Sequence, residues 1–175
     1  MKTNENIGDS IVTSIKTCLE NTGLDILSMS KSKGCYVIRS EVDLGYLKIQ
    51  IKVIYGVEDK MVTVELEFPD RLPTKRFGEI YDIINRINAV LMDIGHFSFY
   101  PKTGKLFLRT GNDVADGSLN SRQFEESICR FIGQGEIGYH LISQVAFDNI
   151  LTDEAWRDFI YQAQTSISNE IPTLH

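Results

Sequence analysis

Hydrophobic residues recur every three or four positions in several parts of the chain, a spacing that gathers them on one face of a helix. The first part is 9–21, where Asp9 fits an N-cap and Gly23 is placed to end the helix in a left-handed conformation. The second begins at Lys75, after Thr74 as its predicted cap. We expect this second helix to cover the inner face of a sheet.

Three segments between these helices have the pattern of strands: 36–42, 46–55 and 61–68. In the second and third, apolar residues alternate with polar ones, as in a strand with one buried and one wet face. The polar positions are mainly lysines in one and glutamates in the other, so they can pair across neighbouring strands. We expect an antiparallel sheet with a charged, solvated outer face. A docking surface on that face is the alternative.

The sequence between residues 96 and 109 predicts a hairpin. A Pro-x-x-Gly loop ends at Gly104, which supplies a positive φ. If Tyr100 pairs with Lys105, one face receives four apolar residues: Phe97, Phe99, Leu106 and Leu108. The same register places His96 opposite Arg109 on the other face.

A later helical region contains the hexapeptide GQGEIG, residues 133–138, which matches the G-x-G-x-x-G pattern of dinucleotide-binding loops. That function requires a buried strand before the first glycine and a helix that starts at the turn. Here the preceding residues, 121–132, have helical spacing instead, and no P-loop lysine follows. We reject nucleotide binding. The glycines predict a bend, a break or a close approach of the helix to the sheet.

Composition narrows the functional classes further. The chain has 175 residues, 42% of them hydrophobic, and a formal net charge of −6, which suits one globular domain and disfavours nucleic-acid binding. No apolar run approaches the roughly 20 residues of a membrane span, and no signal peptide is evident, so we expect a cytoplasmic protein. The three cysteines form no C-x-x-C pair. We expect no metal, no cofactor and no membrane or nucleic-acid partner.

No group of residues in the sequence has the composition and spacing of a known catalytic site. His96 has no nucleophilic serine or cysteine near it in the sequence and lies at a strand start. His140 lies on a helical stretch, where packing or a surface position explains it equally well. We therefore expect a non-enzymatic protein. The alternative is a small-molecule sensor or a cryptic enzyme with a pocket near the 95–110 hairpin. Its polar groups would be His96, Tyr100 and Arg109.

A family pattern is found in three stretches of the sequence: INRINAVLMDIGHFSFYPKTGKLFLRT, ADGSLNSRQFEESICRFI and the ending LTDEAWRDFI. The matching positions are Asn88, Gly95, Phe97, Pro101, Thr103, Gly104 and Arg109. In these residues and in the order of its elements, the chain resembles the bacterial YbjN family of sensory-transduction regulators, whose fold is similar to that of type III secretion chaperones.

The resemblance implies an α+β fold with the order α-β-β-β-α-β-β-α, an antiparallel sheet covered by helices on one face, and a short C-terminal helix. It also implies a protein partner and a homodimer, because chaperones of the similar fold usually form dimers and bind extended segments of other proteins. It carries over no catalytic residue. Relatives run a continuous helix where this chain has its glycine cluster, which leaves the straightness of that helix open.

The expected organisation is one α+β domain over 1–150 and a C-terminal helix and tail over 151–175, packed on that domain or extending it. This last helix starts at Thr152 and places Trp156, Phe159 and Ile160 on one side. Aromatic residues often anchor partners, although docking the helix on its own domain is the simpler role. We predict a chaperone- or adaptor-like protein-binding module with these three residues as its contact site.

Overall fold

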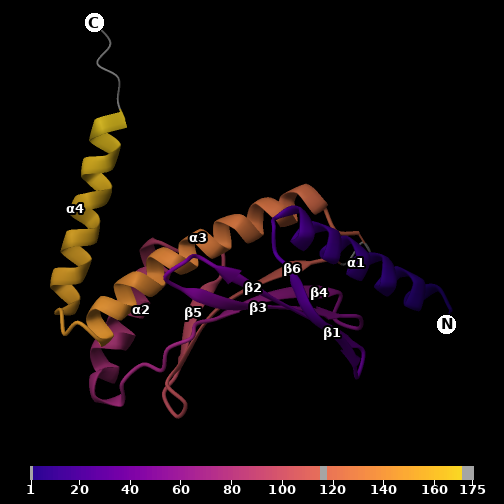
Figure 1. The fold of residues 1–175 in the computed structure, drawn as a ribbon, viewed down its shortest axis with the longest axis horizontal. Coiled ribbons are helices and arrows are strands. Elements are labelled where there is room, and N and C mark those ends of the chain that lie inside the picture. The colour runs from indigo at the N-terminus through magenta and orange to yellow at the C-terminus, as the bar shows by residue number, and fades with distance from the viewer. Residues whose placement is uncertain (1, 115–117, 171–175) are drawn as a thin grey trace, which may run out of the picture.

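The computed structural model describes residues 2–114 and 118–170, which form one antiparallel sheet and a set of helices (Figure 1). The helices are α1 (Lys2–Asn21), the short 3₁₀ turn η1 (Thr74–Arg76), α2 (Phe77–Val90), α3 (Ser121–Ala146) and α4 (Thr152–Glu170). The strands are β1 (Ile26–Ser32), β2 (Cys35–Asp43), β3 (Lys48–Gly56), β4 (Met61–Glu67), β5 (His96–Tyr100) and β6 (Lys105–Asp113). Within the described ranges, none of the helices is long and apolar enough to cross a bilayer.

The six strands lie in the order β1-β2-β3-β4-β6-β5, and every neighbouring pair is antiparallel. The predicted α+β class is therefore confirmed. The predicted hairpin register is also confirmed, because Tyr100 pairs with Lys105 and His96 pairs with Arg109. Gly104 ends the hairpin loop with a φ of 70°.

The structure contains one strand that the sequence pattern did not reveal. Six of the seven residues of β1 are exposed, so its sequence, ILSMSKS, has no buried face and no clear alternation. A two-residue turn at Lys33 and Gly34, with φ values of 48° and 75°, joins it to β2. Positive φ at both positions is the geometry of a type I′ hairpin turn, and this turn brings β1 onto the sheet edge.

Two predicted helix starts and one predicted helix length differ from the structure. Asp9 lies inside α1, which begins at Lys2, and its carboxylate accepts a hydrogen bond of 2.7 Å from the Tyr36 hydroxyl instead of capping a helix. Thr74 begins the turn η1 and makes no capping hydrogen bond to α2. The last helix has 19 residues and so is not short. The helix ending at Gly23 is confirmed, with a φ of 77°.

Helices α1 and α3 cross the same face of the sheet (Figure 1), and the core lies between them and the strands. Helix α2 packs beside α3 and β5, where its apolar stripe of Ile80, Ile83, Ile84 and Ile87 is buried. Each of these elements supplies side chains to one continuous apolar cluster. The division of the chain into 1–150 and 151–175 stays a prediction, and residues 1, 115–117 and 171–175 lie outside the described ranges.

Helix α3 runs without interruption through the GQGEIG segment, so the glycines mark a close approach to the sheet and no break. A Cβ atom added to Gly138 would lie 2.4 Å from Cε2 of Phe97. One added to Gly135 would lie 3.0 Å from Cδ1 of Leu66. Gly133 has nothing within 4 Å of such an atom. Two of the three glycines thus allow the helix to lie directly on β4, β5 and β6.

Residues that carry the family resemblance hold the hairpin in place. The Asn88 side chain in α2 brackets the backbone of Phe97: its Oδ1 accepts from the Phe97 N–H at 2.7 Å, and its Nδ2 donates to the Phe97 carbonyl at 3.0 Å. Gly95 has a φ of 76°, and an added Cβ would lie 2.4 Å from the Arg109 carbonyl oxygen. Asn88 thus substitutes for a neighbouring strand at the β5 edge, and both residues have structural roles.

Candidate functional site

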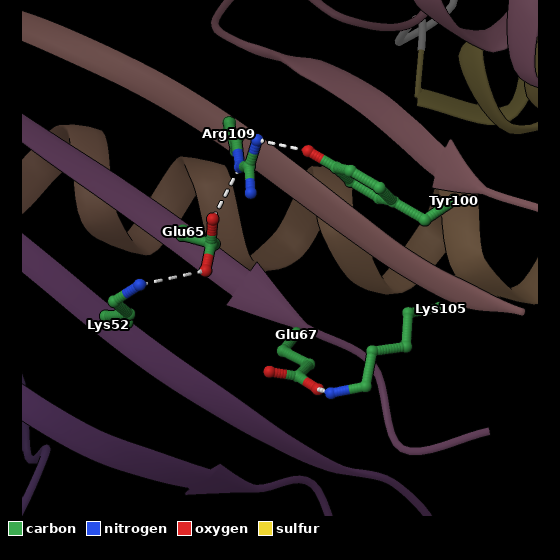
Figure 2. Close-up of polar contacts among 6 residues, drawn as sticks. All are labelled: Lys52, Glu65, Glu67, Tyr100, Lys105 and Arg109. Atoms are coloured by element: carbon green, nitrogen blue, oxygen red, sulfur yellow. Dashed lines mark hydrogen bonds and ion pairs between the residues drawn. The ribbon is translucent and has the colours of Figure 1, made fainter. Parts of the chain in front are cut away.

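The first candidate is the polar network on the sheet face that points away from α3 (Figure 2). Its centre is Glu65 on β4, a carboxylate that is only 7% exposed. Arg109 donates to one carboxylate oxygen of Glu65, and Lys52 lies 3.6 Å from the other. Arg109 also donates to the Tyr100 hydroxyl at 2.8 Å. Alongside, Lys105 forms an ion pair with Glu67.

The network joins three cations to two carboxylates, and each carboxylate is ion-paired within it. Burial alone would lower the pKa of the Arg109 guanidinium, but the hydrogen bond and charge of Glu65 raise that pKa overall. The Arg109 guanidinium also lies over the rings of Phe107 and Tyr100, at 5.2 and 5.5 Å from their centroids. The predicted lysine–glutamate pairing across strands is therefore present. The charged groups on this face bind one another, as expected for a solvated outer face.

The pocket that the sequence suggested at the hairpin would need His96, Tyr100 and Arg109 to converge. Tyr100 and Arg109 do contact each other, whereas His96 is exposed at the edge strand. The hollow on this face is small, about 120 Å³, and lies farther along, where Arg39, Lys52 and Glu65 line it. These contacts do not build an acid–base pair or a deep ligand site at the hairpin.

The second candidate is the groove between α3 and α4, which we call the α3–α4 groove. Figure 1 shows α4 standing away from the body of the protein after the C-terminal end of α3. The angle between the two helices leaves a groove of about 700 Å³, lined by Tyr46, Glu136, Ile137, His140, Leu141, Gln144, Ala155, Asp158, Phe159 and Gln162. Both helices contribute residues at i, i+3, i+4 and i+7, which is one face of each.

Contacts at its base hold α4 in this position. The Thr152 hydroxyl donates to the Glu79 carbonyl of α2 at 3.4 Å. Asp153 forms an ion pair of 2.7 Å with Arg86, which also lies in α2. Arg76 donates to the Ile150 carbonyl in the connection between α3 and α4 at 3.3 Å. The first turn of α4 is therefore tied to α2, which fixes where the groove begins.

The floor of the groove is apolar and its rim is acidic. Leu141 and Ala155 are buried, whereas Ile137 is 44% exposed and Tyr46, on the β2–β3 loop, is 72% exposed. Glu136 and Asp158 supply carboxylates, and no lysine or arginine is found among the lining residues that the structure describes. The Tyr46 hydroxyl donates to Glu136, and this hydrogen bond to a carboxylate raises the pKa of Tyr46.

The three residues of the predicted contact site are placed differently by α4. The Trp156 and Phe159 rings contact each other, with centroids 5.7 Å apart, and both pack against the core while remaining partly exposed. Phe159 also lines the groove, and Ile160 is half-buried. Whether the three contact a partner stays a prediction.

The sequence interpretation missed the contribution of α3 and the β2–β3 loop to this groove. The sequence does contain a signal for the two walls of the groove, which is a shared spacing of i, i+3, i+4 and i+7. The α3 residues are Ile137, His140, Leu141 and Gln144, and the α4 residues are Ala155, Asp158, Phe159 and Gln162. The sequence alone does not place the two stripes opposite each other.

Comparisons with known proteins identify the fold. No protein-family model and no curated protein sequence matches the chain. Among solved structures, YbjN from E. coli is similar, with a TM-score of 0.51 and 11% sequence identity over 78% of this chain and 93% of that one. A chain of the ExsC–ExsE complex is similar with a TM-score of 0.48 and 15% identity, over 77% of this chain and 94% of that one. The predicted resemblance to YbjN is confirmed at the level of the fold.

Proposed function

We propose that this chain is a non-enzymatic protein-binding module, a chaperone- or adaptor-like regulator, and that its partner binds in the α3–α4 groove. The observation that carries this proposal is the groove itself. Helices α3 and α4 each line it with one face, and its floor is apolar. The likeness to YbjN concerns the fold, and a fold does not determine a function. Exposed apolar surface of this kind, bounded by polar residues, is typical of a protein interaction site.

The α4 residues predicted from the sequence belong to the same proposal. Phe159 contacts the partner from the wall of the groove, and the neighbouring Trp156 ring packs against it. Ile160, the next residue along α4, extends the contact. A large aromatic side chain next to an apolar floor is the usual composition of a binding hot spot.

Site-specific crosslinking in the source cells tests the proposal. A photo-reactive amino acid replaces Ile137 in the groove, and a control chain carries the same group at Lys102, an exposed residue of the β5–β6 turn. We expect a discrete protein adduct from position 137 that is absent from position 102. If both positions give the same pattern in a folded protein, the groove is not the interface and the proposal is wrong.

A second candidate function is the binding of a small molecule in the same groove. The volume of about 700 Å³ supports it, because ligand sites typically measure about 300–1,000 Å³. Thermal-shift screening against metabolites distinguishes the two functions. A ligand that raises the melting temperature of the wild-type protein and not of a Phe159→Ala variant would favour the sensor.

The homodimer and the cytoplasmic location implied above belong to the proposal. Sedimentation equilibrium measures the mass of the protein in solution. A monomer at micromolar concentration would show that the homodimer part of the proposal is wrong. Cell fractionation measures the cellular location of the protein. The fraction that contains the crosslinked adduct at position 137 is the location of the partner-bound protein.

A further inference from the structure

The charge and shape of the α3–α4 groove define the kind of partner that fits it. We propose that the groove binds an amphipathic helix of another protein, with apolar residues at i, i+3, i+4 and i+7 and with lysines or arginines beside that apolar stripe. This inference rests on the proposed protein-binding function and specifies its partner.

The shape of the groove favours a helix. Its walls are the faces of α3 and α4 that carry Ile137, Leu141 and Phe159, together with Tyr46 from the β2–β3 loop. A third helix can pack its ridges into the channel between two helices that diverge from a common base. The exposed parts of Ile137 and Tyr46 then become buried against the apolar stripe of the partner.

Backbone hydrogen bonding gives an independent argument against an extended partner. A bound strand satisfies its N–H and C=O groups by pairing with the open edge of a sheet. Both long walls of the groove are helices, whose interior backbone groups are already bonded within the helix. An extended segment would lose hydrogen bonds to water without replacing them, whereas a helix satisfies its own backbone.

The charge of the rim selects the flanking residues of the partner. Glu136 and Asp158 lie on opposite walls, and the described lining contains no lysine or arginine. The Tyr46 hydroxyl occupies one hydrogen-bonding position of Glu136, but a carboxylate accepts several hydrogen bonds. A lysine or arginine on either side of the apolar stripe can therefore pair with a carboxylate on each wall.

The same charges disfavour a second copy of this chain as the occupant. Among the residues that the structure describes, none of the α-helices α1 to α4 contains more lysine and arginine than aspartate and glutamate. The helix α4 is the most acidic, and its early turns carry Asp153, Glu154 and Asp158 against the single base Arg157. Inserting it into a groove with an acidic rim would bring like charges together, which lowers the affinity.

Synthetic peptides provide the test. The first peptide, of about 18 residues, has leucines at i, i+3, i+4 and i+7 with lysines flanking them, which makes about five helical turns. The second has the same composition with the leucines moved to alternate positions, and the third has glutamates in place of the lysines. Binding is followed by the emission of Trp156, the single tryptophan, which packs against Phe159 beside the groove.

We expect only the first peptide to bind the wild-type protein with a saturable change in emission. A Glu136→Lys/Asp158→Lys variant should weaken that binding about tenfold and bind the third peptide instead. A Glu20→Lys/Glu58→Lys variant, with the same change in net charge at two exposed positions far from the groove, should behave as the wild type. Equal binding of the first two peptides, or equal effects of the two variants, would overturn the inference.

The crosslink at position 137 separates this inference from the proposed function. Mass spectrometry of the adduct identifies the partner segment, and a helical segment with flanking lysines or arginines is the expected result. A protein adduct through an extended or acidic segment would overturn the inference and leave the protein-binding function standing. An absence of adduct would overturn both.

Discussion

Helix α3 turns two different faces to its surroundings within a few residues. On one face, Gly135 and Gly138 lie directly on the side chains of the sheet, and Tyr139 is buried beside them. On the other, Ile137 and His140 line the groove in front of α4 and remain in contact with solvent. On the first face, the two glycines let the helix approach the strands between large buried side chains, whereas the second face carries large side chains with little packed over them.

This difference separates stability from binding along a single helix. Atoms on the sheet side contribute to the free energy of unfolding, because any change in their volume acts on a close-packed core. Atoms on the groove side have open space in front of them, so a partner can use them without a loss of packing in the free protein. Substitutions on the two faces should therefore have different effects, and four of them test this.

The largest effect is expected from Gly138→Ala. The new Cβ would lie 2.4 Å from Cε2 and 2.7 Å from Cζ of Phe97, a ring that is packed against Phe68 and whose backbone is bracketed by Asn88. Overpacking of this kind lowers the free energy of unfolding by roughly 1–3 kcal/mol. Urea denaturation followed by circular dichroism measures it. An unchanged denaturation midpoint would show that Gly138 lies farther from the Phe97 ring than this spacing requires.

The substitution Tyr139→Phe should have the next largest effect. The buried Tyr139 ring stacks on Phe68 at a centroid distance of 4.8 Å, and its hydroxyl donates to Asp70 in the loop after β4. Removing this hydroxyl should lower the free energy of unfolding by about 1 kcal/mol, because one hydrogen bond is lost while the ring stacking remains. Denaturation of the two proteins at pH 7 measures the difference.

The pH dependence of the same pair gives an independent check. Burial, followed by the hydrogen bond to Asp70, raises the pKa of Tyr139 in the folded protein. Above about pH 10 the unfolded chain therefore releases this proton while the folded protein keeps it, so the stability from the raised pKa is lost as pH rises. The wild type should lose stability in that range faster than the phenylalanine variant. Parallel pH profiles would contradict the raised pKa of Tyr139 in the folded protein.

The substitution Gly133→Ala is the matched control for Gly138→Ala. The two glycines lie in the same helix, but nothing lies within 4 Å of a Cβ added at Gly133. Alanine should raise the free energy of unfolding by up to about 1 kcal/mol, because glycine is the poorer helix former. Thermal unfolding measures the gain. A loss of stability at Gly133 would mean that this side of α3 is also packed.

The smallest effect on stability is expected from Ile137→Gln on the groove side. With 44% of its surface exposed, Ile137 should change the free energy of unfolding by no more than about 0.5 kcal/mol. The same variant should reduce binding of the lysine-flanked peptide. A large loss of stability without any loss of binding would reverse the comparison between the two faces.

Local patterns predicted much of this fold correctly. The hairpin register from His96 to Arg109 follows from one Pro-x-x-Gly loop, because in a strand a shift of one residue would turn every apolar side chain to the wrong face. The alternation of apolar residues in β3 and β4 predicted both strands and pairing between their lysines and glutamates, which the structure shows for Lys52 and Glu65. Strand β1 was not predicted, because a strand with six of seven residues exposed has no alternation of buried and exposed positions.

The candidate site depended on the tertiary structure. The sequence by itself determined that the chain is of the α+β class, that the residues before GQGEIG are helical, and that the last helix carries aromatic residues. Only the tertiary structure decided that Gly135 and Gly138 face the sheet and that Ile137 lies across a groove from Phe159. Periodicity and turn chemistry act between residues close in sequence. The meeting of two helix faces depends on the angle at which α4 leaves α3, and contacts with α2 set that angle.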